Sequence, residues 1–194
     1  MFLRRNEGYT LLELIFVIGI TGMMTLALVS FVVTTSRGYQ YLDHQSRAAV
    51  DLSNTLNRVS KVIRGTTDVI DAQANTLTIY GYFSPNDAVV KKIRYFKSGN
   101  KLMVGVIPPT GAGPNYTYNQ SDEEVSVLQD NLSMGSSSIF TYYDASGTQL
   151  TGTFATTQIK QIGLNMAINP KPTILEKPIS NQTIVTLRNK KVNL

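Results

Sequence analysis

The residues with the clearest chemical potential lie at the N-terminal end of the chain, where charges border a long apolar run. Arg4 and Arg5 are followed by Gly8, and one carboxylate, Glu13, stands just before the uncharged residues 14–33. These twenty residues are enough for an α-helix to cross the hydrocarbon core of a bilayer. A carboxylate near the centre of such a helix costs about 2.5–3.5 kcal/mol, so we expect Glu13 to have a partner of opposite charge.

Residues 8–13, with the sequence Gly-Tyr-Thr-Leu-Leu-Glu, resemble the prepilin motif of type IV pilins and type II secretion pseudopilins. The resemblance implies that a prepilin peptidase of the membrane cuts between Gly8 and Tyr9. It also implies that the new N-terminus at Tyr9 is methylated, and that Glu13 pairs with the amine of a neighbouring subunit during filament assembly. Tyr9 stands where the family usually has phenylalanine, which keeps an aromatic ring at that position.

The residue types suit this chemistry. Gly8 leaves no side chain at the scissile bond and lets the backbone bend into a protease cleft, and Arg4 and Arg5 hold the leader on the cytoplasmic side. A freed α-amine at Tyr9 has a reference pKa of about 7.7–8.0 and would carry a positive charge. The alternative is an uncleaved single-pass anchor, in which Glu13 sits at the level of the lipid headgroups.

Beyond the apolar run, the spacing predicts that the same helix continues to Arg64 and ends before Gly65. An apolar stripe recurs at helical spacing along this second half. Its members are Leu42, Ala49, Leu52, Leu56, Val59 and Ile63. The predicted organisation is therefore a leader at 1–8, a transmembrane helix at 9–33, its amphipathic continuation at 34–65, and a β-rich globular head at 66–194.

The remainder of the chain consists of runs rich in β-branched and aromatic residues, separated by turn signals. Strands are predicted at 69–70, 76–82, 88–97, 101–107, 124–131, 138–143, 149–153, 158–168 and 179–188. The fold class is thus α+β, a long N-terminal helix packed on an antiparallel β-sheet head, as in pilins. The pattern at 139–144, 159–168 and 186–189 also resembles J-class minor pseudopilins and W-class minor pilins.

A second group of chemically interesting residues is a basic hairpin that also holds Tyr95 and Phe96. Its cations are Lys91, Lys92, Arg94, Lys97 and Lys101, and Asp87 is the one acid expected nearby. Cations beside aromatic rings can bind single-stranded nucleic acid or another ligand. The alternative is a polar strand face whose lysines prevent edge-to-edge aggregation.

Other kinds of site have little support in the sequence. The acidic residues 122–124 lack the spaced ligands of a calcium loop, so we expect neither a metal nor a cofactor. The chain has no cysteine and a single histidine, and it lacks a glycine-rich phosphate loop, so we do not expect an enzyme. The net charge of +5 is too small to argue for nucleic acid alone.

These observations together predict a structural minor subunit of a type IV pilus-like or type II secretion pseudopilus filament, acting in initiation or at the tip. The partners implied are the prepilin peptidase, other pilin or pseudopilin subunits, an inner-membrane assembly platform and membrane lipid. The N-terminus would be cytoplasmic and the head periplasmic or extracellular. The alternative is a tip-displayed binding module for DNA, a surface or a secreted substrate. Secretion, twitching and competence machines are not distinguished.

Overall fold

A computed structural model describes residues 9–113 and 115–188 of the chain. They contain one long helix, α1 (Leu11–Arg64), two short 3₁₀ helices and nine strands. The predicted helix is confirmed, and it begins two residues later than Tyr9. The chain divides between Asp43 and His44 into two compact units, which are described separately.

The N-terminal unit consists of the first part of α1. This segment contains no proline, and two threonines in its middle have their hydroxyls hydrogen-bonded. Thr21 donates to the carbonyl of Val17 at 2.8 Å, and Thr25 donates to the carbonyl of Thr21 at 2.8 Å. Polar side chains bonded in this way to the preceding turn are compatible with an apolar surrounding.

The C-terminal unit contains two antiparallel sheets. The first is a five-stranded meander in which each strand pairs with the next along the chain. Its strands are β1 (Asp68–Ala72), β2 (Thr76–Gly81), β3 (Lys91–Ser98), β4 (Lys101–Ile107) and β5 (Glu124–Gln129). The 3₁₀ helix η1 (Gln120–Asp122) lies in the long connection before β5.

The second sheet has four strands in the order β7-β6-β8-β9. They are β6 (Phe140–Tyr143), β7 (Gln149–Leu150), β8 (Gln161–Ile168) and β9 (Ile179–Thr186), with the 3₁₀ helix η2 (Thr156–Gln158) between β7 and β8. The predicted strands are all present, but their division between two sheets was not predicted. Alternation identifies the buried face of a strand without saying which other strand pairs with it.

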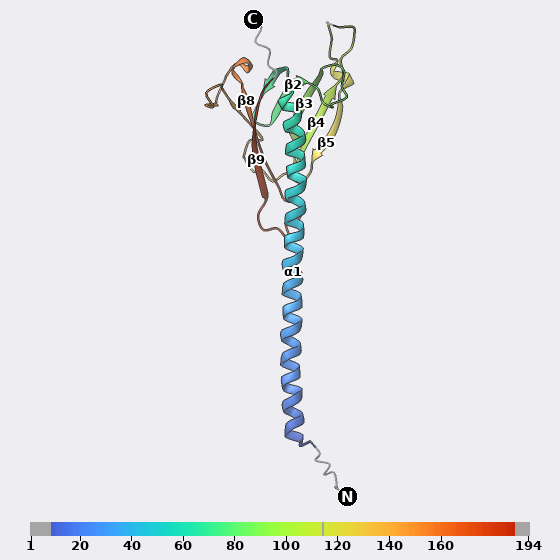
Figure 1. The fold of residues 1–194 in the computed structure, drawn as a ribbon, viewed down its shortest axis with the longest axis vertical. Coiled ribbons are helices and arrows are strands. Elements are labelled where there is room, and N and C mark those ends of the chain that lie inside the picture. Colours follow the sequence, from blue (N-terminus) through green and yellow to red (C-terminus); the bar gives the residue numbers. More distant parts are fainter. Residues whose placement is uncertain (1–8, 114, 189–194) are drawn as a thin grey trace. The chain divides into compact units, whose positions relative to one another are not determined.

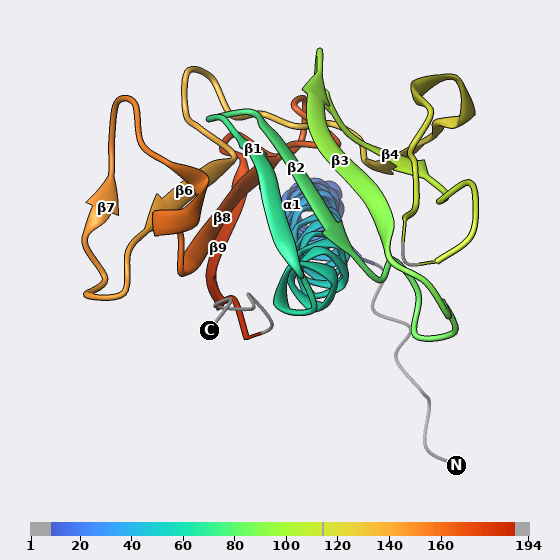
Figure 2. The same cartoon turned by 90° about the horizontal axis from the view of Figure 1, so that it is seen from above.

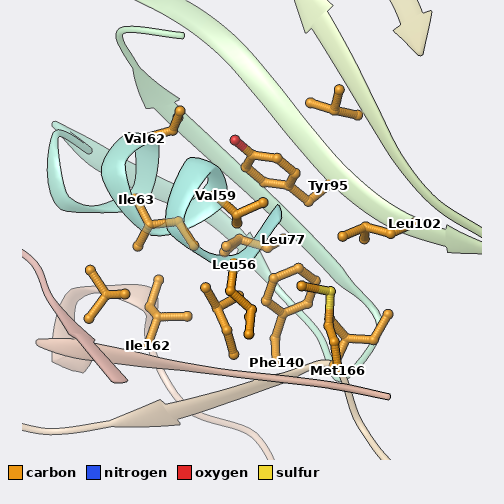
Figure 3. Packing of buried hydrophobic residues seen from close by; sticks show 14 of the residues in the cluster. Leu56, Val59, Val62, Ile63, Leu77, Tyr95, Leu102, Phe140, Ile162 and Met166 are labelled. Carbon is orange, nitrogen blue, oxygen red and sulfur yellow. The ribbon is translucent and has the colours of Figure 1, made fainter. Parts of the chain in front are cut away.

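The C-terminal part of α1 lies between these sheets, with β3 and β4 on one side and β8 and β9 on the other (Figures 1 and 2). Leu56, Val59 and Ile63 of the helix meet side chains from both sheets in one hydrophobic core (Figure 3). Those side chains include Leu77, Tyr95 and Leu102 of the first sheet, and Phe140, Ile162 and Met166 of the second. This is the α+β arrangement of a pilin-like fold, as predicted.

Hydrogen bonds also join the two sheets directly. The hydroxyl of Tyr142 on β6 donates to the carbonyl of Gln73 at 2.7 Å, and the amides of Ile139 and Phe140 both donate to the carbonyl of Ala74 at 3.0 Å. The turn between β1 and β2 is therefore tied to the start of β6. Burial, with a smaller contribution from the nearby Asp71 carboxylate, raises the pKa of Tyr142, so its phenol stays protonated and keeps this bond.

Two members of the predicted apolar stripe are not buried. Leu42 and Ala49 are exposed, whereas Ala48 is buried with Leu52, Leu56, Val59 and Ile63. At 100° per residue, Ala48 and Ala49 lie about equally far, roughly 50°, on either side of the centre of the face formed by Leu52, Leu56, Val59 and Ile63. Helical spacing therefore does not distinguish the two alanines, and the tertiary structure decides that Ala48 is the buried one.

The predicted strand at 88–97 was too long at its start, because β3 begins at Lys91. The Asp87 carboxylate accepts hydrogen bonds from the amides of Phe83 and Ser84 at 2.9 and 2.8 Å. It also accepts one from Lys91 at 2.7 Å. These bonds organise a turn, which keeps Val89 out of the strand.

Substitutions of the adjacent Ala48 and Ala49 test which of the two faces the hydrophobic core. Ala48→Leu inserts a larger side chain into a filled core, so we expect it to lower the free energy of unfolding by about 1–3 kcal/mol. Ala49→Leu points away from that core and should change it by less than about 0.5 kcal/mol. Thermal unfolding of the full-length chain in detergent micelles measures both. Equal effects of the two variants would contradict the assigned face.

Candidate functional site

The start of α1 gives Glu13 a local environment that the sequence analysis missed. Thr10 precedes the first helical residue, and its side-chain oxygen accepts a hydrogen bond from the amide of Glu13 at 3.3 Å. The Thr-x-x-Glu spacing is that of a capping box, in which the glutamate side chain can return to the backbone amide of the threonine. The signal was present in residues 10–13. A carboxylate in the first turn also interacts favourably with the helix dipole.

The predicted processing site lies at the edge of the described residues. Tyr9 is described and its side chain is 83% exposed, whereas Gly8 and the rest of the leader lie outside the described residues. Glu13 is four residues after Tyr9, in the first turn of α1. The structure therefore describes Glu13, for which pairing with a neighbouring amine is expected. Cleavage of the bond between Gly8 and Tyr9 remains a prediction.

The first part of α1 presents an unpartnered apolar surface. All large apolar side chains at 11–33 are exposed, from 42% for Val33 to 80% for Leu11. Apart from the adjacent helix backbone, no atom of the described residues lies within 4 Å of the Cβ that a side chain would have at Gly19 or Gly22. Monomeric soluble proteins rarely expose a contiguous apolar surface of this extent. With a mean hydropathy of 2.3 in its most apolar window, this single helix near the N-terminus is long and apolar enough to span a membrane.

The basic hairpin carries more acids than the sequence analysis expected. Lys91 pairs with Asp87 at 2.7 Å, Arg94 with Glu123 at 2.7 Å, and Lys101 with Asp130 at 3.4 Å. The expectation of Asp87 as the one nearby acid was therefore wrong. Both additional acids flank β5, which pairs with β4 beside the hairpin. A sequence pattern does not reveal this proximity, because Glu123 is 29 residues away from Arg94.

The cations of the hairpin are also divided between the two faces of the strand. Lys92 and Arg94 lie on the face opposite the buried Ile93 and Tyr95. The predicted ligand-contact residues Lys91, Lys92, Arg94, Lys97 and Lys101 therefore do not form one cluster of unpaired cations. Three of the five have a carboxylate within ion-pair distance. The hairpin thus offers weaker support for nucleic-acid binding than its composition did.

The ion pair between Arg94 and Glu123 is the best-formed of the three. The guanidinium donates twice to the carboxylate, at 2.9 and 2.7 Å, and lies 4.1 Å from the ring centroid of Phe96. Hydrogen bonding to Glu123 raises the pKa of Arg94, although burial opposes this rise. The Glu123 side chain is only 9% exposed and covers Gly105, where a Cβ would collide with the carboxylate. Gly105 thus makes room for the pair.

Two contacts of Tyr118 hold the connection before β5 against the part of the first sheet that also carries the Arg94–Glu123 ion pair. The Tyr118 hydroxyl donates to the carbonyl of Val90 at 3.0 Å, and its ring lies 4.9 Å from the ring of Tyr80. Burial raises the pKa of Tyr118, so this hydroxyl remains a donor at neutral pH. The structure therefore assigns Arg94, Glu123 and Tyr118 to holding this connection against the sheet.

Asp87 is the anion that organises the other end of the hairpin. Burial raises the pKa of Asp87, but the hydrogen bonds from Lys91 and from the amides of Ser84 and Phe83 together outweigh burial. The pKa of Asp87 is therefore lower than its ordinary value. The carboxylate is therefore ionised at neutral pH. Within 9–113 and 115–188, no three histidine, aspartate or glutamate side chains gather as a metal site would require. Glu123, a member of the acidic residues 122–124, is engaged by Arg94.

No family model matches the chain, and no curated protein has a matching sequence.

A double-mutant cycle tests whether Gly105 serves the ion pair. Arg94→Gln removes the cation from a nearly buried carboxylate, which keeps a hydrogen bond from Gln120, and Gly105→Ala displaces that carboxylate, so each should lower the free energy of unfolding by about 1–3 kcal/mol. The two changes act on one contact, so the double variant should cost at least about 0.5 kcal/mol less than their sum. Thermal unfolding measures all four proteins.

Lys101→Gln is the matched control for this cycle. It removes a pair whose two side chains are 49% and 56% exposed, so we expect a change of less than about 1 kcal/mol. Strict additivity of Arg94→Gln and Gly105→Ala would refute the coupling.

Proposed function

We propose that this chain is a structural subunit of a type IV pilus-like or type II secretion pseudopilus filament. The observation that carries the proposal is that one acid, Glu13, stands in the first turn of a helix whose large apolar side chains at 11–33 are all exposed in the described part of the chain. The glycine at position 8, directly before Tyr9, adds the sequence context of prepilin cleavage. A membrane helix that later packs among other helices requires a surface of this kind.

In this proposal, cleavage after Gly8 frees an amine at Tyr9, and the amine of one subunit pairs with Glu13 of its neighbour. Opposite charges in an apolar surrounding offset part of each other's desolvation, and an unpaired charge there is strongly unfavourable. Pairing therefore favours one axial position of each subunit over others. A capping-box hydrogen bond from the Thr10 backbone amide to the Glu13 carboxylate would not prevent this ion pair, because an ionised carboxylate has about four acceptor positions.

We further propose that the protein is a minor subunit acting in filament initiation or at the tip, and that it is not an enzyme. The resemblance of the β-rich half to J-class pseudopilins and W-class pilins supports the first statement. The lack of cysteine and the single histidine support the second. The subunit would begin in the inner membrane, with a cytoplasmic N-terminus, and would meet the prepilin peptidase, the assembly platform and other subunits there.

Mass spectrometry of the purified chain tests the processing step. We expect a mature protein that begins at Tyr9 and carries an additional methyl group on its α-amine. Co-expression with an active prepilin peptidase should yield this species, and an inactive peptidase should leave the chain uncut. A chain that retains Met1 with an active peptidase would instead indicate an uncleaved single-pass anchor.

Three variants separate the charge of Glu13 from its capping geometry. Glu13→Leu and Glu13→Gln should each lower incorporation into filaments at least about tenfold, because both remove the anion. Glutamine retains the capping-box interaction, and Thr10→Ala removes the cap while retaining the anion, so Thr10→Ala should assemble nearly normally. The measurement is the amount of variant in sheared filament fractions relative to the membrane fraction. Normal incorporation of Glu13→Gln would overturn the proposed pairing.

A further inference from the structure

A groove in the C-terminal unit lies beside α1, where the turn after β2 approaches the helix. Its volume is about 830 Å³, within the range of sites that hold a small molecule or a short peptide. The helix contributes polar and positively charged side chains, and the turn contributes aromatic ones. Those that could recognise a ligand are Asn54, Asn57, Arg58, Lys61, Tyr82 and Phe83.

The two cations of this groove are not neutralised by the protein. Arg58 and Lys61 are exposed, no carboxylate lines the groove, and neither cation has an ion pair within 9–113 and 115–188. Asp87, the nearest acid along the turn, is already bound to Lys91 and to two backbone amides. Favourable interaction with the helix dipole accounts for Lys61 in the last turn, but it does not extend to Arg58.

The remaining side chains indicate the class of ligand. The Arg58 guanidinium lies 5.5 Å from the ring centroid of Phe83, so one face of that ring is occupied, while Tyr82 is 41% exposed. The amides of Asn54 and Asn57 both donate and accept hydrogen bonds, as a peptide backbone requires of its partner. The helical side of the groove spans 54–65, which is about 16 Å at 1.5 Å per residue and matches about five extended residues.

We propose that this groove binds an extended acidic peptide segment that carries an aromatic side chain. Its carboxylates would pair with Arg58 and Lys61, its backbone would bond to the asparagine amides, and its ring would pack on Tyr82. Single-stranded nucleic acid fits less well, because binding of successive bases requires several free aromatic faces. This inference goes beyond filament assembly, since it concerns recognition by the head and does not involve Glu13.

Fluorescence anisotropy with the full-length chain in neutral detergent micelles tests the proposal. The probe is a fluorescein-labelled hexapeptide of glutamate and tyrosine, and a peptide with lysine in place of glutamate is the control. We expect the acidic peptide to bind and the basic peptide not to bind. Arg58→Glu/Lys61→Glu should weaken binding at least about tenfold, because two attractive contacts become repulsive. Tyr82→Ala should weaken it about threefold or more.

Lys171→Glu/Lys177→Glu is the matched control variant. It changes the net charge by the same amount at two exposed lysines that do not line the groove, so binding should change less than about twofold. The variant Arg58→Gln/Lys61→Gln repeats the test if charge reversal alters thermal unfolding. Equal losses in both double variants, or no binding by the wild type, would overturn the proposal. Tighter binding of an equally charged oligothymidylate would replace it with a nucleic-acid site.

Discussion

The C-terminal unit depends on the burial of one face of α1 between two sheets. Each sheet has one apolar face that must be covered, and a helix with a single apolar stripe can cover only a limited width of sheet. Here the same stripe serves both sheets, since Leu52 and Ile63 are fully buried among residues from each. Burying a leucine or isoleucine contributes about 1.5–3 kcal/mol, so the helix stabilises the sheets mainly through this shared contact.

The same helix carries a second apolar surface, which the described residues 9–113 and 115–188 leave exposed. Side chains at 11–33 are exposed, although they are as apolar as those buried at 52–63. The difference lies in the surroundings, because the strands cover only the later part of the helix. The earlier part is long and apolar enough to span a membrane, and in the proposed subunit lipid or other helices would cover it. In that setting a charge such as that of Glu13 is tolerated only with a partner.

The distribution of charge in the head follows from the tertiary structure. Composition concentrates cations in the β3–β4 hairpin, but the fold brings Asp87, Glu123 and Asp130 to them. Among the described residues, Arg58 and Lys61 of the helix lie together in a groove that no carboxylate lines. A charged residue thus becomes a candidate for recognition when no acid of the fold neutralises it, and composition alone does not reveal this.

The sequence by itself determined the features that depend on local spacing. The helix end at Arg64 and the nine strands were predicted, because periodicity and turn residues act within a few positions. The cap at Thr10 was equally readable. Only the tertiary structure decided that the strands form two sheets, that Ala48 rather than Ala49 is buried, and that Glu123 meets Arg94. These features depend on contacts between distant segments, and periodicity within one segment carries no information about its partners.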